Sequence, residues 1–284
     1  MKVLILGSQG MLGHVVEQYF QQKGHITKGT SRSGDNNTYA FDAMKNVKDI
    51  ESFIDEFKPD AVVNCVGILN KVAEDNKPLA VMANSYLPHY VDTVCRNKGV
   101  KFVHISTDCV FNGKRDGGYT ETSFRDAIDF YGRSKGLGEV ENNASVTLRT
   151  SIVGPDMNAN GIGLFQWFMN QEGTAGGFDK AIWSGVTTLE LTKAIEKAIE
   201  CNLTGIRHVV NGDKIDKYSL LQLFKKHFNK DIEIERNSSY IINKSLVCTT
   251  DFDFNVPSYD DMVKEMSEWV TSHASLYSKS QRVA

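Results

Sequence analysis

The sequence lacks the features that mark disulfide-stabilised proteins and metal sites. It contains five cysteines, and no two of them form a C-x-x-C pair. Its seven histidines show no metal-ligand spacing either. We therefore expect free buried thiols in a reducing compartment, with neither disulfides nor a bound metal. The cysteines are Cys65, Cys95, Cys109, Cys201 and Cys248.

Long apolar runs and an excess of positive charge are also missing. No run approaches the roughly 20 residues that span a membrane, and Val3 to Leu6 is too short for the apolar region of a signal peptide. The formal net charge is −3, without a cluster of lysine or arginine, so we expect no nucleic-acid partner. These absences favour a cytoplasmic protein without a membrane segment.

The remaining composition is that of an ordinary globular protein, with 41% hydrophobic and 24% charged residues. A chain of 284 residues has ample length for a large core. This length suits one nucleotide-binding domain with a smaller lobe better than it suits two independent domains.

A glycine-rich turn follows the first apolar run. Val3 to Leu6 has the length and branching of a buried parallel strand, and an amphipathic helical pattern begins after the glycines. In a strand–turn–helix unit, glycines let the backbone approach a pyrophosphate, and the free N–H groups at the helix start hold the anion. We expect dinucleotide binding here, although glycine spacing also serves tight packing alone. The expected cofactor contacts are Gly7, Gly10, Met11, Leu12 and Gly13.

The end of the second predicted strand indicates which dinucleotide is bound. His25 to Thr30 forms this strand, and Arg32 follows between two serines, with no acid at that point. An acid would bond the ribose 2′-hydroxyl of NAD, whereas an arginine accommodates the 2′-phosphate of NADP. The sequence therefore favours NADPH as cofactor. The alternative is that Arg32 is a solvated loop charge.

Strands and helices alternate over the first 150 residues, which predicts right-handed crossovers and an α/β fold with a doubly wound parallel sheet of the Rossmann type. Asn64 and Gly67, at the end of one strand, are expected at the rim where ligands of such sheets bind. The further predicted strands are Thr38–Phe41, Ala61–Gly67 and Val100–Ser106, and the helices are Val47–Phe57 and Pro78–Lys98.

A tyrosine and a lysine four residues apart provide candidate proton chemistry. On a helix, Tyr131 and Lys135 share one face. An ammonium close to a phenol favours the phenolate, so we expect Lys135 to lower the pKa of Tyr131. Thr107, at the end of the strand from Val100, supplies a hydroxyl for a carbonyl group. Such pairs also occur by chance on surface helices, but the nucleotide-binding turn favours catalysis.

Together these motifs resemble the extended short-chain dehydrogenase/reductases, and specifically the dTDP-4-dehydrorhamnose reductase family of nucleotide-sugar 4-ketoreductases. The resemblance implies that Thr107, Tyr131 and Lys135 are catalytic, that Tyr131 and Lys135 also contact the cofactor, and that a nucleotide sugar is the substrate. It also implies that Asp42 and Asn64 line the nucleotide path, and members are often homodimers. The motifs are Gly7–Gly13, His104–Gly113, Tyr119–Thr122, Tyr131–Lys135 and Leu148–Thr150.

The resemblance places the NADP-binding domain at residues 1–150 and a smaller substrate-binding lobe mainly at 151–284, with part of 181–212 completing the sheet. In that second half, the residue pattern predicts helices over Gly161–Asn170, Thr187–Glu200, Tyr218–Phe228 and Tyr259–Val270. The polar segment Ser275–Ala284 is expected to be loosely held.

Several loop positions depart from the family pattern, and they bear on the substrate. Trp183–Thr188 replaces the frequent Gly-x-Pro-Thr, Cys109 replaces a common tyrosine, and Ala127 and Asp129 replace proline and asparagine. We expect Thr107, Asp108, Trp183 and Thr187 to contact the substrate, with Trp183 stacking on a uracil or covering a sugar face and threonine hydroxyls bonding an acetamido group. Alternatively, Trp183 simply packs the lobe.

These departures favour a UDP-2-acetamido-2,6-dideoxy-4-keto-hexose as substrate, and dTDP-4-dehydrorhamnose is the alternative. A related 4,6-dehydratase or 4-epimerase is disfavoured. Such dehydratases carry a glutamate where Cys109 follows Asp108, and both enzymes retain NAD, which fits Arg32 badly. A non-catalytic NADP-binding regulator or subunit is the remaining alternative. Degenerate members usually lose the tyrosine or the lysine, and this chain keeps both.

Overall fold

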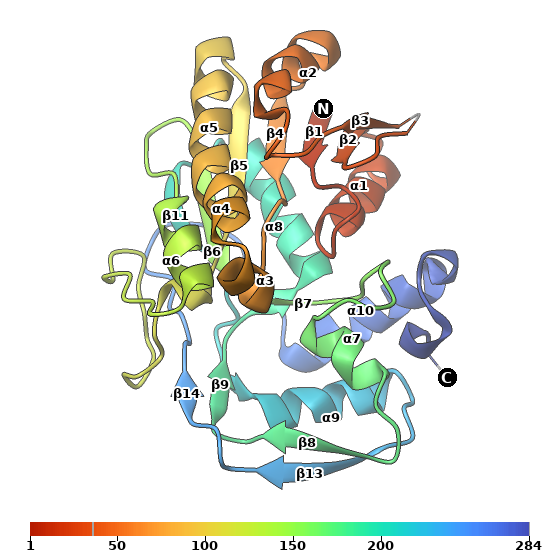
Figure 1. Cartoon of the computed structure of the whole chain (residues 1–284). Helices are drawn as coiled ribbons and strands as arrows, with labels where there is room; N and C mark the ends of the chain where they lie inside the picture. Colours follow the sequence, from red (N-terminus) through yellow and green to blue (C-terminus); the bar gives the residue numbers. More distant parts are fainter. Residues whose placement is uncertain (36, 284) are drawn as a thin grey trace.

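The computed structural model describes residues 1–35 and 37–283 (Figure 1). Within them, seven strands form one parallel sheet in the order β11-β6-β5-β4-β1-β2-β3, which confirms the predicted α/β fold. The strands are β1 Lys2–Leu6, β2 Ile26–Ser31, β3 Thr38–Ala40, β4 Ala61–Asn64, β5 Lys101–Thr107, β6 Val146–Thr150 and β11 Gly205–His208.

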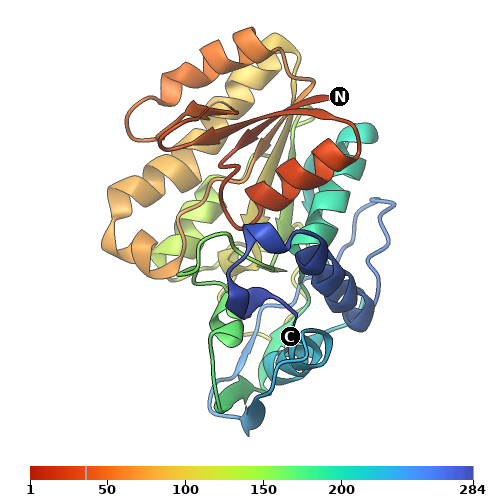
Figure 2. The same ribbon diagram turned by 90° about the vertical axis from the view of Figure 1, so that its right-hand side faces the viewer.

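Helices cover both faces of this sheet (Figure 2). Val3 and Ile5 of β1 pack towards α1 and α8, whereas Leu4 and Leu6 pack towards α2 and α5. This alternation is the expected consequence of the two-residue period of a strand whose faces are both buried. The helices are α1 Gly13–Gln22, α2 Ile50–Phe57, α3 Asn70–Asp75, α4 Lys77–Ala80, α5 Leu87–Lys98, α6 Phe130–Leu137 and α8 Thr188–Glu200.

The helix predicted over Pro78–Lys98 is not continuous. A π-helical segment, Val81–Tyr86, separates α4 from α5. Pro88 has no N–H to donate to the carbonyl of Asn84, which explains the wider turn at this point. The Asn84 side chain bonds both backbone groups of Ile68 and the hydroxyl of Ser134 in α6. The interruption therefore anchors the helix that carries Tyr131.

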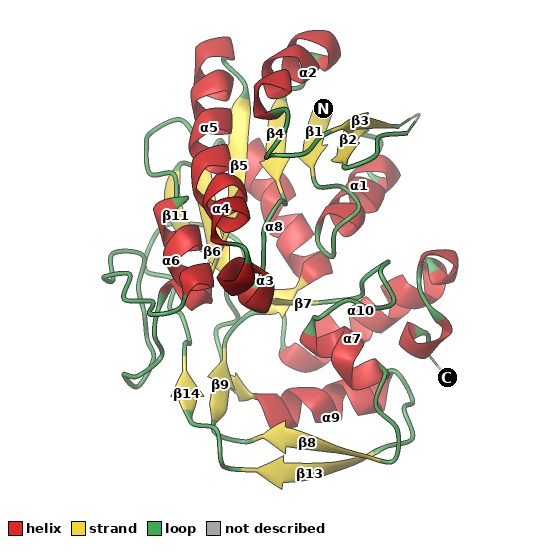
Figure 3. Ribbon diagram, viewed as in Figure 1, coloured by secondary structure: helices red, strands yellow, loops and turns green. Residues whose placement is uncertain are grey.

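After Thr150 the chain enters a second group of elements, shown below the sheet in Figure 3. There β9 lies between β12 and β14, and β8 pairs with β13. The chain also returns to the sheet through α8 and β11. The predicted helix Gly161–Asn170 is shorter, because α7 begins only after Gly163. The elements are β7 Ile152–Val153, α7 Leu164–Met169, β8 Thr174–Phe178, β9 Ala181–Trp183, β10 Val186–Thr187, β12 Ile215–Asp216, α9 Lys217–His227, β13 Glu233–Asn237, β14 Ile242–Asn243 and α10 Tyr259–Ser272.

The prediction of a loosely held C-terminus is wrong for residues 275–283; Ala284 lies outside the described residues. Tyr277 is buried, its hydroxyl contacts His14 Nε2 at 3.0 Å, and it accepts a hydrogen bond from Trp269 Nε1 at 2.9 Å. Gln281 is also buried, and its side-chain amide accepts a hydrogen bond from the Asp156 N–H and donates one to the Asp156 carbonyl. The segment thus docks beside the start of α1 (Figure 2). The polar groups of Tyr277 and Gln281 in this segment therefore make buried hydrogen bonds with the rest of the chain.

A buried ion pair ties α6 to the sheet. Arg149 on β6 donates to both carboxylate oxygens of Glu139, at 2.7 and 2.6 Å, and both side chains are fully buried. Ser106 on β5 donates to the same carboxylate at 2.6 Å. Burial alone would raise the pKa of Glu139, but these partners outweigh it and hold the pKa below its ordinary value.

The other side of the Arg149 guanidinium is satisfied as well. Its Nη1 donates to Nε2 of His208 at 2.9 Å, and the Nδ1 of that ring donates to the Val247 carbonyl at 2.8 Å. Burial lowers the pKa of His208 to about 4, so the ring is neutral and able to accept. The guanidinium therefore joins β6, β11 and the end of α6.

We predict that Arg149→Met lowers the free energy of unfolding by about 2–4 kcal/mol, because buried Glu139 would lose its bidentate partner and keep only Arg125 and Ser106. Chemical denaturation followed by circular dichroism measures this change. The matched control is Arg133→Met on the exposed side of α6, which should cost less than about 1 kcal/mol. Equal losses in the two variants would contradict a special role for the buried pair.

Candidate active site

Helix α6 presents Tyr131 and Lys135 on one face, as predicted. The helix is capped by Asp129, whose carboxylate accepts a hydrogen bond from the Gly132 N–H at 2.7 Å. Gly132 lies so close to the Cys109 carbonyl that an added Cβ would be 2.1 Å from that oxygen. The missing side chain therefore lets α6 lie against the end of β5, so that both predicted side chains are buried there.

The structure brings Thr107, Tyr131 and Lys135 together. All of them line one cavity of about 440 Å³, together with Asp108 and Cys109. The Thr107 Oγ1 accepts the Cys109 N–H at 3.1 Å and donates to the Asp108 carboxylate at 3.2 Å. The Lys135 ammonium donates to the Ile105 carbonyl at 2.7 Å. A hydroxyl, a phenol and an ammonium thus face a common space.

The predicted effect of Lys135 on Tyr131 is wrong for this arrangement. Burial raises the pKa of Tyr131, Cys109 and Asp108 add to the rise, and only the hydrogen bond from Thr107 opposes it. Burial also lowers the pKa of Lys135 to about 8. The physical reason is that desolvation of the phenol dominates while the ammonium bonds a backbone carbonyl. Tyr131 therefore remains protonated at neutral pH, as a proton donor must be.

The two cavity cysteines are not reactive nucleophiles. Burial raises the pKa of Cys65 to about 12, and it raises that of Cys109 to about 12 as well.

In the described part of the chain, no group of three or more histidine, cysteine or acidic side chains is placed to hold a metal ion. Among the same residues, no helix has the length and apolar character to cross a membrane.

The glycine-rich turn has the geometry that an anion site requires. Gly7 adopts a φ of +77°, and Gly13 packs so tightly that an added Cβ would be 2.1 Å from the Gly7 carbonyl. Within the described residues, the backbone N–H groups of Met11 and Leu12 donate no hydrogen bond. They lie just before α1, where the helix dipole favours negative charge. Gly13 therefore allows the turn to pack closely, while the backbone N–H groups of Met11 and Leu12 are the hydrogen-bond donors available to an anion.

A second cavity of about 790 Å³ runs along this turn. Arg32, Asp42 and Gly67 line it, as do Gly7, Gly10 and Met11. The cavity lined by Thr107, Tyr131 and Lys135 shares several of these walls, which makes one continuous path from Arg32 to Tyr131. The shared residues are Gly10, Met11, Cys65, Val66, Gly67 and Asp156. An extended dinucleotide with a phosphate near Arg32 fits the donors and the shape of this path.

Three predicted site residues are placed elsewhere. Asn64 is fully buried, bonds His104 and caps the Val66 N–H, so it shapes the rim without lining it. Trp183 is only 3% exposed in the core of the lobe. Thr187 is 2% exposed, and its hydroxyl accepts the Glu190 N–H as the N-cap of α8. Direct contact of these three side chains with a ligand is therefore not supported.

Sequence reasoning also missed residues at the site. Asp156 borders both cavities from the loop after β7, and Ile162 borders the one that contains Tyr131. This loop has no periodic pattern, and its position depends on the C-terminal segment that binds Asp156. Only the Gly154-Pro155 pair before it signalled a turn.

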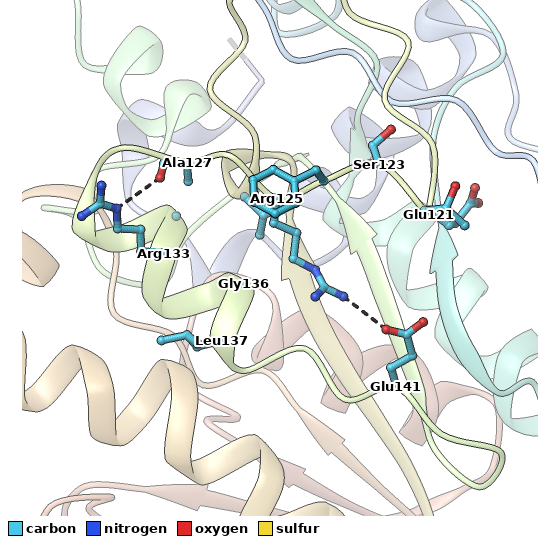
Figure 4. Close-up of a pocket in the computed structure, with 12 residues that line it drawn as sticks. Glu121, Ser123, Arg125, Ala127, Arg133, Gly136, Leu137 and Glu141 are labelled. Carbon is cyan, nitrogen blue, oxygen red and sulfur yellow. Dashed lines mark hydrogen bonds and ion pairs between the residues drawn. The ribbon is translucent and has the colours of Figure 1, made fainter.

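A third cavity, of about 680 Å³, lies on the opposite side of α6 (Figure 4). Arg125 reaches Glu141 there, and Arg133 bonds the Ala127 carbonyl. Gly136 and Leu137 form part of its wall, but none of the predicted site residues does. This hollow is therefore separate from the path described above.

Comparison with known proteins finds a matching family and several relatives of similar sequence. The sequence profile of the RmlD substrate binding domain matches residues 1–240. A probable low-salt glycan biosynthesis reductase of Haloferax volcanii is 33% identical over 164 residues, which is 54% of each chain. A spore coat polysaccharide biosynthesis protein of Bacillus subtilis is 32% identical over 161 residues, covering 54% of this chain and 53% of that protein. The chain thus spans about half the length of the curated relatives it matches.

The fold is similar to that of a solved dTDP-4-dehydrorhamnose reductase from Bacillus anthracis, determined in complex with NADP. The TM-score is 0.80 with 21% identity, over 93% of this chain and 98% of the other. At that identity, the likeness concerns the fold alone.

Proposed function

The chain belongs to the RmlD substrate-binding domain family, and from this premise we propose that it is an NADPH-dependent reductase of a nucleotide-linked 6-deoxy-4-keto sugar. It would convert the C4 ketone into a hydroxyl group. The observation that carries the proposal is the convergence of Thr107, Tyr131 and Lys135 on a cavity that shares walls with the glycine-turn cavity. The reductase names of relatives support the same chemistry.

The residues along the path suit NADPH. The free N–H groups of Met11 and Leu12 would hold the pyrophosphate, and exposed Arg32 would bind the 2′-phosphate. Asp42 would border the adenosine part, and Lys135 would hold the nicotinamide ribose. When bound, the nicotinamide supplies the hydride that reduces the ketone carbon. A fold relative that was solved in complex with NADP supports this choice of cofactor.

The chain's own residues provide the proton. The Thr107 hydroxyl positions the carbonyl oxygen beside the Tyr131 phenol, which gives its proton to that oxygen as negative charge develops there. The phenolate left behind is buried and needs a positive charge. Lys135 lies one helical turn away on the same face, and it would supply this charge by turning from the Ile105 carbonyl, which it bonds in the structure, towards the phenolate.

The finer identity of the substrate rests on the cavity wall. We propose a UDP-2-acetamido-2,6-dideoxy-4-keto-hexose, because Cys109 stands at the catalytic cavity where the resembling reductases commonly carry a larger tyrosine. The smaller side chain leaves room for an acetamido group. Trp183 and Thr187 are buried, so the expected stacking by the indole and the expected hydrogen bond from the Thr187 hydroxyl no longer support this substrate. The second candidate is dTDP-4-dehydrorhamnose, which relatives named dTDP-4-dehydrorhamnose reductase favour.

A non-catalytic NADP-binding regulator or subunit is a weaker candidate. Tyr131 and Lys135 are both buried at the cavity rather than displaced from it. A protein without turnover has no need to keep a lysine whose burial lowers its pKa to about 8.

We predict that Tyr131→Phe lowers kcat by about 10²–10⁴-fold, because the general acid is lost. Its affinity for NADPH should stay close to that of the parent, as measured by fluorescence titration. Tyr86→Phe, on an exposed side chain, is the control and should behave like the parent. A Tyr131→Phe enzyme within a few-fold of parental kcat would remove the phenol from the reaction.

Cofactor choice is tested at Arg32. A charge-assisted bond to the 2′-phosphate contributes about 1.5–3 kcal/mol, which corresponds to roughly ten- to a hundred-fold in affinity. Arg32→Ala should weaken NADPH binding by that factor and leave NADH binding nearly unchanged. Arg236→Ala, an exposed change in β13, should alter neither dissociation constant. If Arg32→Ala weakened the binding of NADPH and of NADH equally, this residue would act through the fold and not through the 2′-phosphate.

The substrate proposal is tested by measuring the reduction rates of the two candidate sugars separately at low substrate concentration and comparing them. The UDP-linked acetamido sugar and dTDP-4-dehydrorhamnose should differ in kcat/KM by well over tenfold, in favour of the former. An acetamido group that fills the space beside Cys109 adds contacts that an analogue without this group cannot make. Faster reduction of dTDP-4-dehydrorhamnose would refute the UDP-sugar proposal and preserve the reaction type.

A further inference from the structure

The loop between β7 and α7 borders both cavities of the proposed cofactor path. Asp156 lines the two cavities, Asn158 lines the larger one, and Ile162 and Gly163 line the smaller one. An added Cβ on Gly163 would be 3.1 Å from the Met11 Sδ, so the end of the loop lies against the glycine-rich turn. The position of this loop therefore determines how wide the path is where its two cavities join.

Few hydrogen bonds outside the loop fix its position. The Asn158 N–H donates to the Asp156 carboxylate at 2.9 Å, and the Gly161 N–H donates to the Asn158 carbonyl at 2.9 Å, so these bonds stay within the loop. Apart from α7, which follows directly, Gln281 is the only hydrogen-bond partner of the loop in the described part of the chain. The loop thus depends on a residue 125 positions from Asp156.

Gln281 holds one residue of the loop by both of its backbone groups. Its Oε1 accepts the Asp156 N–H at 2.9 Å, and its Nε2 donates to the Asp156 carbonyl at 2.7 Å. The same Nε2 also donates to the Ser278 hydroxyl at 3.3 Å, which fixes the amide within its own segment. Because the side chain is fully buried, solvent does not compete for these bonds. They therefore fix the peptide planes on both sides of Asp156.

The same C-terminal segment also holds the glycine-rich turn. The Tyr277 hydroxyl donates to His14 Nε2 at 3.0 Å, and the His14 Nδ1 donates to the Gly10 carbonyl at 2.9 Å. Burial lowers the pKa of His14, so the neutral ring can donate at one nitrogen and accept at the other. Gly10 and Asp156 each line both cavities. The segment therefore holds two walls of the path at the point where the cavities join (Figure 2).

Neither Tyr277 nor Gln281 lines either cavity, so their effect on a ligand must pass through the residues that they hold. Tyr277 also packs in the apolar core, and the stability of the fold explains its burial. Gln281 has no such explanation, because a buried amide adds little net stability and an apolar side chain would pack without the cost of desolvation. Its position is explained better by the fixed loop that it produces.

We propose that the C-terminal segment sets the width of the cofactor path, and that Gln281 is a positioning residue for NADPH binding. The inference rests on the proposed function, because it concerns the site proposed for that cofactor. With Gln281 in place, the loop is ordered before the cofactor arrives. Without it, the affinity for NADPH falls in proportion to the fraction of molecules in which the loop still has the binding position.

Fluorescence titration of the intact protein with NADPH tests this role without a sugar substrate. Gln281→Met keeps the length of the side chain and loses both bonds to Asp156. It should raise the NADPH dissociation constant by about five- to thirty-fold, the range that two neutral hydrogen bonds represent. Lys279→Met, an exposed change in the same short helix, is the matched control and should bind NADPH like the parent.

A second control separates positioning from a general loss of stability. Ser145→Ala removes a buried hydrogen bond to Asp92, directly before β6. It should lower the melting temperature and leave the NADPH dissociation constant at the parental value. Equal weakening of NADPH binding in Ser145→Ala and Gln281→Met would overturn the proposal, and so would parental affinity in Gln281→Met.

The proposed function fails separately. A protein whose NADPH affinity depends on Gln281 but which reduces no keto sugar keeps this inference and loses the proposed reaction. A Gln281→Met enzyme that reduces the keto sugar with parental kcat and parental KM for NADPH keeps the reaction and loses this inference.

Hydrogen exchange of the parent protein gives an independent readout. Because coupling between two sites is reciprocal, NADPH must stabilise the segment that stabilises its binding. NADPH should therefore slow exchange in peptides that cover residues 277–283 by several-fold, although none of these residues lines the path. Unchanged exchange in that segment would overturn the proposal, and this result decides the matter if Gln281→Met does not fold.

Discussion

The Arg149 guanidinium is the group on which the placement of the proposed catalytic side chains depends. It holds Glu139, which comes two residues after α6 ends, and Ser106 bonds the same carboxylate directly before Thr107. Thr107 on β5 and Tyr131 on α6 are therefore tied to one buried charge. Such a pair contributes little net stability compared with apolar packing, but it strongly penalises any arrangement that separates its partners. It thus fixes geometry more than it adds stability.

Close backbone contacts act together with this charge. Gly132 allows α6 to touch the Cys109 carbonyl, and Gly138 allows it to touch the Asn84 carbonyl, where an added Cβ would be 1.8 Å away. The Asn84 side chain then bonds Ser134 on the same helix. With contacts at both ends and a hydrogen bond between them, α6 has one position relative to β5. The phenol and the hydroxyl consequently share a cavity wall.

Much of this arrangement could be predicted from the sequence, because it depends on local patterns. Branched apolar runs and glycine spacing define β1 and its turn, and the four-residue interval places Tyr131 and Lys135 together. The rest depends on long-range packing. The burial of Trp183, the use of Thr187 as a helix cap, and the bond from Lys135 to the Ile105 carbonyl have no local signature. The docking of Tyr277 on His14 joins residues from opposite ends of the chain.

We propose that a ketone carbon of a nucleotide sugar is reduced beside Tyr131. NADPH that carries deuterium at both hydrogen positions of the nicotinamide C4, supplied with the UDP-linked 4-keto sugar and with dTDP-4-dehydrorhamnose, tests it most directly. We predict that one of the products contains deuterium at sugar C4, detected by NMR and mass spectrometry, in equal amount to the NADP formed. NADPH that stays unoxidised with both sugars, or a sugar product without deuterium, would contradict the claim.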